Sequence, residues 1–465
     1  MKHSELVFVG VLVAIAAAGA VLVDILIPAS EPARPSPTGG EVISSGWYCP
    51  APPGGEEFQS AMAIANVGDD TLGLRRFAVG GSGQSEVAQG NLEASRENIT
   101  LLSDFKVNDG VGVVDAFGGE SVTNLVSLSR GKGVGVSRCS AQPSNRWLFA
   151  TGSTARGENH YLLVANPFRE EAVINVRFLT PDREVVPARL KDLVIPAQSQ
   201  STVFLSDYFV ESPAFGLDIT AQQGRVVVSR YSQITRAGAK GVSLDVGVGA
   251  PATSWTFADG ERGPAGEESL VVINPGTREA LVGVVFMTES ERTAPPALTE
   301  VPVPAGRQVT IKTEDHIPEA TSYGISLSST NGEPVVAERV NTASVDRNSG
   351  YATSFGTTSP AMKWALPVGS PAGGNARLSI VNPGDSRTSV RVTLLGGDGE
   401  MRPDELSNVA LDPGRKVSFD LTPMLNGGLF TAVVESTRSP IAAEARLSLT
   451  SPYADVSYHP GQPLR

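Results

Sequence analysis

The sequence contains very little histidine and cysteine. Its 465 residues include only four His and two Cys, and 37 Lys plus Arg stand against 49 Asp plus Glu. So few His and Cys leave few ligands for a zinc site and few imidazoles for a catalytic triad. The formal net charge of -12 disfavours general binding to nucleic acid, because the phosphates would be repelled. We therefore expect no metal, no cofactor and no nucleic-acid partner.

The short motifs of common catalytic and nucleotide-binding sites are also missing. The sequence has no phosphate-binding loop, no His-Glu-x-x-His, no Gly-x-Ser-x-Gly and no dinucleotide glycine pattern. Ser103-Asp-Phe-Lys106 matches the Ser-x-x-Lys of penicillin-binding enzymes, but the supporting Lys-Thr-Gly is absent, so Ser103 is expected in a helix N-cap or turn. The acidic pairs Glu56-Glu57 and Glu267-Glu268 lie near glycines and are expected in solvated turns. We expect no catalytic residue and no enzymatic activity.

An N-terminal stretch without charge predicts a membrane anchor. Residues Leu6 to Val23 are uncharged, and as a helix they span about 27 Å, close to the thickness of the hydrocarbon layer. Lys2 precedes the stretch and places the N-terminus in the cytoplasm. The alternative is a signal peptide cleaved after Ala20. Both interpretations send the rest of the chain across the membrane, and we expect an uncleaved single-pass anchor over residues 1–27.

After a Pro/Gly-rich extended linker over residues 28–46, the chain repeats itself four times. Each repeat begins near a Trp, which is followed 18 or 19 residues later by an Asn that ends an apolar strand. These recurrent positions are Trp47, Trp147, Trp255 and Trp364, and then Asn66, Asn166, Asn274 and Asn382. The predicted repeats cover residues 47–145, 146–253, 254–361 and 362–465.

Each repeat has the pattern of a β-sandwich. About seven short strands of alternating polarity, bounded by Gly, Pro, Asn and Asp, favour an immunoglobulin-like sandwich. The repeats are too long for single propeller blades or for solenoid units. We predict an all-β protein of four tandem immunoglobulin-like β-sandwiches after one transmembrane helix, arranged in a line rather than in a closed ring.

The only two cysteines lie in the first repeat. Cys49 follows its Trp and Cys139 lies near its end, 90 residues later. In an exported chain such a pair is typical of a structural disulfide, and two buried free thiols are the alternative.

The recurrent Trp and Asn are expected to be structural, because they occupy the same place in every repeat. Binding would use residues that differ between repeats, and the aromatic and His candidates are Tyr48, His160, Tyr231, Tyr351 and Tyr453.

The chain resembles a family of uncharacterised actinobacterial envelope proteins, domain of unknown function 5719. The resemblance depends on the apolar N-terminal helix, the recurrent Trp, and strand ends such as Leu378-Ser-Ile-Val-Asn-Pro383. The first repeat departs from it, with Asn66-Val67 in place of Asn-Pro. The resemblance implies a location and an architecture but no chemistry.

These observations together predict a membrane-anchored, extracytoplasmic, non-enzymatic scaffold or adhesion-type protein of the cell envelope. Its four sandwiches would contact an envelope protein or glycan. The alternative is a carbohydrate-binding or accessory subunit of an envelope polysaccharide enzyme, and a third possibility is an enzyme of unfamiliar design.

Overall fold

The computed structural model describes residues 44–54, 58–81, 83–107, 109–236, 238–262, 267–318, 321–342, 344–345, 348–369, 374–425, 427–449 and 455–464. The chain divides into two units, Met1–Val42 and Ile43–Arg465, and only the second contains described residues. The predicted anchor over residues 1–27 and almost all of the linker lie outside them. No helix in the described part is long and apolar enough to cross a membrane.

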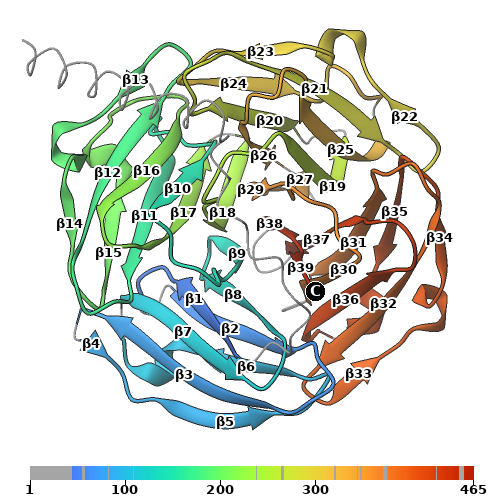
Figure 1. Ribbon diagram of the computed structural model, residues 1–465, viewed down its shortest axis with the longest axis horizontal. Coiled ribbons are helices and arrows are strands. Elements are labelled where there is room, and N and C mark those ends of the chain that lie inside the picture. The colour runs from blue at the N-terminus through green and yellow to red at the C-terminus, as the bar shows by residue number, and fades with distance from the viewer. Residues whose placement is uncertain are drawn as a thin grey trace, which may run out of the picture. The chain divides into compact units, whose positions relative to one another are not determined.

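Period-two alternation of apolar and polar residues makes nearly all of the described chain antiparallel β-structure. The strands form four successive two-sheet sandwiches, which we call the first to the fourth sandwich (Figure 1). The first consists of β1 (Ser44–Pro50), β2 (Phe58–Asn66), β3 (Leu72–Gly80), β4 (Gly83–Gln84), β5 (Ala88–Leu92), β6 (Glu97–Leu101), the 3-10 helix η1 (Leu102–Phe105), β7 (Gly110–Phe117), β8 (Ser121–Ser129) and β9 (Gly133–Arg138).

The second and third sandwiches repeat this plan. The second consists of β10 (Arg146–Phe149), β11 (Glu158–Asn166), β12 (Ala172–Leu179), β13 (Glu184–Val185), η2 (Ala188–Leu190), β14 (Leu193–Ile195), β15 (Ser199–Phe204), η3 (Leu205–Asp207), β16 (Gly216–Gln223), β17 (Val227–Arg236) and β18 (Ala239–Val246). The third consists of β19 (Ser254–Arg262), β20 (Glu267–Asn274), β21 (Ala280–Met287), β22 (Arg292–Thr293), η4 (Pro296–Leu298), β23 (Val301–Val303), β24 (Arg307–Lys312), β25 (Thr321–Ser329), β26 (Val336–Thr342), the short hairpin β27 (Ser344–Val345) and β28 (Asn348–Ser349), and β29 (Ala352–Phe355).

The fourth sandwich has one extra strand at the C-terminal end. It consists of β30 (Lys363–Gly369), β31 (Asn375–Asn382), β32 (Thr388–Gly396), β33 (Gly399–Met401), η6 (Asp404–Leu406), β34 (Val409–Leu411), β35 (Arg415–Asp420), the one-turn helix α2 (Thr422–Leu425), β36 (Leu429–Ser436), β37 (Ala442–Leu449), β38 (Asp455–Pro460) and β39 (Gln462–Pro463). β39 pairs with β30 at the edge of the outer sheet.

The order of strands is shared by all four sandwiches. In the first, the outer sheet has the order β1-β7-β3 with β4 and β5 at the far edge, and the inner sheet has the order β6-β2-β8-β9. β2 pairs with β6 and β8 in the inner sheet, and β7 pairs with β1 and β3 in the outer sheet, all antiparallel. The repeats are therefore antiparallel two-sheet β-sandwiches.

The four sandwiches close into a ring, so the prediction of a linear array was wrong. In Figure 1 the last strands of the inner sheets, β9, β18, β29 and β38, surround a common axis, and β9 packs against both β18 and β38. The first and fourth sandwiches are joined by hydrogen bonds from Thr431 Oγ1 to Glu97 Oε1 (3.0 Å) and from Gln462 Nε2 to the Thr123 carbonyl (3.1 Å). Repeat length misled the prediction, because it compared each two-sheet repeat with a single-sheet blade.

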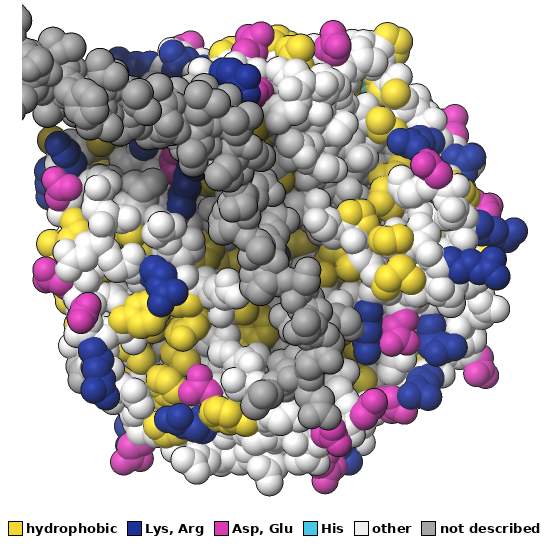
Figure 2. All heavy atoms as spheres, viewed as in Figure 1, with side chains coloured by type: hydrophobic (Ala, Val, Ile, Leu, Met, Phe, Trp, Pro, Cys, Tyr) yellow, Lys and Arg dark blue, Asp and Glu magenta, His cyan; other side chains and the backbone are white. Residues whose placement is uncertain are grey.

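Apolar packing makes the junctions continuous with the cores. One buried cluster runs from Val79 in β3 to Phe355 in β29 and so includes side chains of three sandwiches. Val134 and Val136 of β9 pack with Leu447 and Leu449 of β37 across the closure. On the face shown in Figure 2, charged side chains of both signs lie mostly around the periphery. The ring is therefore held by buried apolar contacts, while its rim is solvated.

Candidate functional site

The four recurrent Trp are buried structural residues. Their exposed fractions are 8%, 4%, 0% and 0% in chain order. The indole Nε1 donates to a main-chain carbonyl about eighty residues later in three repeats, at Val226, Val335 and Ile441 (2.8, 3.0 and 2.8 Å). In the first repeat, Trp47 Nε1 donates instead to Ser121 Oγ at 3.0 Å. Each ring thus ties the first strand of a sandwich to its inner sheet.

The four recurrent Asn share one hydrogen-bonding pattern. Asn274 Nδ2 donates to the carbonyls of Arg278 (2.7 Å) and Val303 (2.9 Å), and its Oδ1 accepts the N–H of Gly276 (3.0 Å). Asn66, Asn166 and Asn382 make the corresponding bonds. All four are buried, where water does not reach the main chain of the turn. The side-chain amide therefore supplies the hydrogen bonds that these main-chain groups need.

The structure contains a disulfide between Cys49 and Cys139, and it has no free cysteine in the part of the chain that it describes. The two Cα atoms are 4.6 Å apart, and main-chain hydrogen bonds of 2.9 Å join the adjacent Tyr48 and Ser140 in both directions. The bridge links β1 to the residue that follows β9. It therefore closes the first sandwich, as the sequence predicts.

Of the other interpreted residues, the acidic pairs differ from the expectation or lie outside the described residues, whereas Ser103 lies in a turn as expected. Glu268 is not in a solvated turn: it lies in β20, is buried and accepts a hydrogen bond from Asn341 Nδ2 at 3.2 Å. Glu56 and Glu57 lie outside the described residues. Ser103 lies in the exposed 3-10 turn η1, where its carbonyl accepts the Lys106 N–H, but its side chain makes no cap. Side chains alternate along a strand, so Glu267 points outward and Glu268 points inward. The prediction of a turn did not take this alternation into account.

Buried ionic groups join neighbouring sandwiches. Arg230 of β17 is fully buried and donates to Glu338 of β26 in the next sandwich, and to Asp245 Oδ2 at 3.2 Å. Glu338 Oε2 also accepts the N–H groups of Ala150 and Thr151, both at 2.9 Å. The carboxylate of the third sandwich thus binds the main chain of the two residues that follow β10 in the second.

The junction between the third and fourth sandwiches has a similar buried ionic cluster with more charged residues. Arg339 donates to Glu444 of β37, whose Oε2 accepts the N–H of Asp259 at 2.9 Å. Asp259 is in turn paired with Lys416 Nζ at 2.9 Å, and both side chains are fully buried. Burial raises the pKa of Asp259, but Lys416, Arg446 and Arg377 outweigh it, so this pKa lies below its ordinary value. These charges are locked in pairs between sandwiches.

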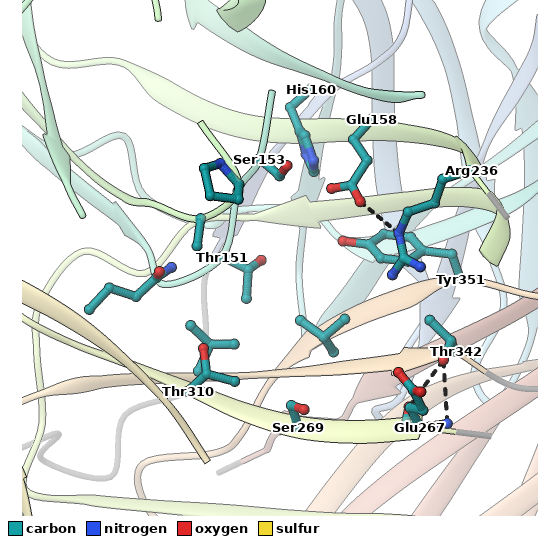
Figure 3. Close-up of a pocket in the computed structure, with 16 residues that line it drawn as sticks. Thr151, Ser153, Glu158, His160, Arg236, Glu267, Ser269, Thr310, Thr342 and Tyr351 are labelled. Carbon is teal, nitrogen blue, oxygen red and sulfur yellow. Dashed lines mark hydrogen bonds and ion pairs between the residues drawn. The ribbon is translucent and has the colours of Figure 1, made fainter. Parts of the chain in front are cut away.

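A cavity of about 260 Å³ lies where the second and third sandwiches meet (Figure 3). Figure 3 shows Ser153, Glu158, His160 and Arg236 on one side of it, and Ser269, Thr310 and Thr342 on the other. His160 and Tyr351, two of the variable residues singled out from the sequence, both line this cavity. Tyr48 and Tyr231 do not line it, and Tyr453 lies outside the described residues.

The floor of the cavity contains polar atoms that lack partners within the described residues. His160 is 1% exposed, with Nδ1 hydrogen-bonded to Ser232 Oγ at 2.8 Å, while Nε2 has no protein partner there. Gln308 is 3% exposed; its Nε2 donates to the Ala150 carbonyl at 2.7 Å, and its Oε1 accepts nothing in the same part of the chain. A buried polar atom without a hydrogen bond costs about 1–3 kcal/mol, so a ligand or water that hydrogen-bonded to either atom would recover this cost.

The electrostatics of the cavity are close to neutral. Burial, with Arg230 nearby, lowers the pKa of His160 to about 3, so its imidazole is uncharged near pH 7. Glu158 and Arg236 form an ion pair at 2.6 Å, and Glu267 adds one exposed carboxylate at the rim. No group of His, Cys, Asp and Glu suited to a metal ion occurs among the described residues. The lining offers hydroxyl, amide and imidazole groups for hydrogen bonding.

Comparison with known proteins places the chain in a family. A family model described as a family of unknown function (DUF5719) matches residues 111–361 and again 250–463. The chain belongs to this family. The two matches overlap, as expected of a chain built from repeats, and they begin after the part of the first repeat that departs from the pattern.

The other comparisons add little to this assignment. No curated protein matches the chain. Among solved structures, a crystal structure of Thermotoga maritima 1070 is 22% identical and covers 23% of this chain and 96% of its own, with a TM-score of 0.21. The Anabaena sensory rhodopsin transducer is also 22% identical and covers 19% and 96%, with a TM-score of 0.17. These similarities are too small to carry an argument about the fold or the function.

Proposed function

We propose that the protein is a non-enzymatic scaffold on the outer side of the membrane, anchored by residues 1–27 and spaced from the bilayer by residues 28–46. Its ring would present binding surfaces to an envelope protein or glycan. The two-sheet sandwiches suit this role, because loops at the ends of such sandwiches vary without disturbing the core.

The observation behind this proposal is the position of the strongly buried ionisable groups. In an enzyme, groups with perturbed pKa values usually gather in a substrate cavity. Here Arg230, Arg339, Asp259 and Lys416 are paired with charges at the junctions between sandwiches. Such pairs do little for stability compared with apolar packing, but they penalise every wrong order or register of the sandwiches. This arrangement favours a rigid ring that holds its surface loops in place.

The alternative function, carbohydrate binding, is favoured by the cavity between the second and third sandwiches. Its lining combines hydroxyl groups with the buried ring of Tyr351, and two of its buried polar atoms have no partner in the described residues. Mixed polar and aromatic lining of this kind is typical of sites for small polar molecules.

The location can be tested by thiol labelling, because the only two cysteines form a disulfide. Val210 is 70% exposed, so Val210→Cys provides a single reactive thiol on the ring. We expect a membrane-impermeant maleimide to label it in intact cells and the protein to remain in the membrane fraction. The matched control, Val164→Cys, is fully buried and should react only after denaturation. Labelling of Val210→Cys only after the membrane is permeabilised would overturn the proposed location.

The partner can be sought with a photoreactive phenylalanine analogue at Phe117, which is 41% exposed. Placed there and at other exposed positions, it should cross-link to the same envelope component in intact cells. The same analogue at Phe178, which is fully buried, should give no intermolecular product. Products confined to cytoplasmic proteins would contradict the scaffold proposal.

A further inference from the structure

We propose that the cavity between the second and third sandwiches binds a neutral, hydroxyl-bearing ligand the size of one monosaccharide unit. This proposal deepens the alternative function given above, because it names the site and the class of ligand. It does not depend on the location of the ring in the cell.

The unpartnered atoms set the chemistry of the ligand. Gln308 Oε1 can only accept, so the ligand must donate a hydrogen bond to it. His160 Nε2 donates or accepts according to the tautomer set with Ser232. Figure 3 shows the imidazole of His160 directed into the cavity. A hydroxyl group, which both donates and accepts, satisfies either atom.

The charges argue against an anion. Two acidic residues, Glu158 and Glu267, and one basic residue, Arg236, line the cavity. Glu158 already pairs with Arg236, so the remaining charge at the rim is negative. An anionic ligand would be repelled and a neutral one would not.

Size and access agree with a single sugar ring. About 260 Å³ lies just below the usual range of drug-sized pockets, which begins at about 300 Å³. The floor is buried, but Glu267 and Thr310 at the rim are exposed, so the cavity reaches the surface. Val271, Val340 and the ring of Tyr351 offer apolar area for the C–H face of a sugar, beside hydroxyls of Ser269 and Thr342 for its polar edge.

The scarcity of histidine provides a direct test. The chain has four His, so imidazole ¹H–¹⁵N correlations of the full-length protein in detergent can be assigned to individual residues. The probes are neutral monosaccharides (glucose, galactose, mannose and arabinose), with glucuronate as the charged counterpart of glucose. We expect at least one neutral sugar to shift the His160 resonances to saturation and to leave those of His3, His316 and His459 in place. Glucuronate should bind at least about tenfold more weakly.

Variants assign the binding to this cavity. Ser269→Phe, which fills the cavity from β20, should abolish the His160 shift without lowering the thermal midpoint, because Ser269 is only half-buried. Thr310→Val removes one hydroxyl at the rim and should weaken binding severalfold. Its matched control is Thr202→Val, at the equivalent position of β15 outside the cavity, and this variant should bind normally.

Methyl glycosides separate two sources of the ligand. A site for the end of an envelope polysaccharide should bind the methyl glycoside at least as well as the free sugar, whereas a site for free sugar should lose binding on methylation. Either result supports the proposed class of ligand. The proposal is overturned if no neutral sugar shifts His160, if glucuronate binds as well as glucose, or if Ser269→Phe leaves binding unchanged. None of these results affects the thiol-labelling test of the scaffold.

Discussion

Asp455 Oδ2 of β38 accepts a hydrogen bond from the main-chain N–H of Val134 in β9 at 2.9 Å, across 321 residues of sequence. The same carboxylate accepts the N–H groups of Val242 (3.2 Å) and Tyr351 (3.3 Å). Val456 supplies a further main-chain N–H. One buried side chain thus binds main chain from all four sandwiches around the axis of the ring.

The other three sandwiches have glycine at the position of Asp455. Gly133 of β9 and Gly241 of β18 occupy the equivalent register, and Gly350 lies two residues before β29. A Cβ on Gly133 or Gly241 would lie 1.8 or 2.2 Å from the Asp455 carboxylate, so neither position accepts a side chain. The ring therefore requires a single acidic side chain on its axis and three glycines that make room for it.

The first prediction follows from this arrangement. Asp455→Gly leaves at least three buried N–H groups without an acceptor, so we expect the free energy of unfolding to fall by at least about 3 kcal/mol. Because these donors converge on a site that a carboxylate fits, added formate should restore part of the loss at constant ionic strength. Chemical denaturation with and without formate measures both effects. The matched control, Asp398→Gly, replaces an exposed residue of the same sandwich and should change neither quantity. Chloride at the same ionic strength is the comparison salt. If neither chloride nor formate restores any of the stability lost in Asp455→Gly, the result argues against an anion site on the axis.

Local patterns in the sequence predicted the repeats, because Trp and Asn make similar hydrogen bonds within each sandwich. The indole of Trp255 and the amide of Asn274 satisfy main chain within their own sandwich, so their spacing survives in every repeat. The disulfide between Cys49 and Cys139 was predictable for the same reason, since both residues belong to one sandwich.

Ring closure and the cavity depend on contacts between repeats, which local patterns do not encode. Asp455 meets Gly133 only when β38 and β9 are brought together in a particular register. Once the strands are aligned, however, a column of three glycines and one Asp is a signal for a shared axis. His160 and Tyr351 stood out from the sequence as variable residues, but nothing in their spacing showed that they face one cavity.

A second prediction concerns the buried Trp. Trp255→Ala should lower the free energy of unfolding by about 3–5 kcal/mol, since it empties a fully buried site. Chemical denaturation gives the size of the loss, and limited proteolysis should show new cleavage in the third sandwich. Phe117→Ala, at a side chain that is 41% exposed, is the control and should cost far less. A small loss for Trp255→Ala would mean that the surrounding side chains collapse into the space, contrary to the structural role assigned to this Trp.

A third prediction separates charge from hydrogen bonding at the junction of the second and third sandwiches. Arg230→Met leaves Glu338 and Asp245 buried without their shared cation and should cost about 3–5 kcal/mol. Adding Glu338→Gln removes one of these two unpaired charges, and the amide oxygen can still accept the N–H groups of Ala150 and Thr151. The double variant should therefore be more stable than Arg230→Met in chemical denaturation. If it is equally or less stable, the cost of Arg230→Met comes from lost packing and not from the stranded carboxylate.

The last prediction concerns pH and the closure between the first and fourth sandwiches. Glu97 is 6% exposed, and its Oε1 accepts a hydrogen bond from Thr431 at 3.0 Å. Burial raises the pKa of Glu97 to about 8, and the hydrogen bond from Thr431 only partly opposes this. Because the pKa is higher in the folded protein than in the unfolded chain, the protonated form favours folding. Its stabilisation is fully present below about pH 4.5 and is lost as the pH rises through about 8.

Glu97→Gln removes this titration but keeps an amide oxygen for Thr431. The free energy of unfolding of the variant, relative to the native protein, should therefore rise between about pH 4.5 and 8, by up to about 1.4 kcal/mol per pH unit. Chemical denaturation at a series of pH values measures the difference. Glu93→Gln is the control, because Glu93 is an exposed neighbour paired with Arg96, and its difference from the native protein should not change over this range. Parallel pH profiles for the native protein and Glu97→Gln would show that Glu97 is ionised in the closed ring, and that some other donor stabilises its charge at the closure.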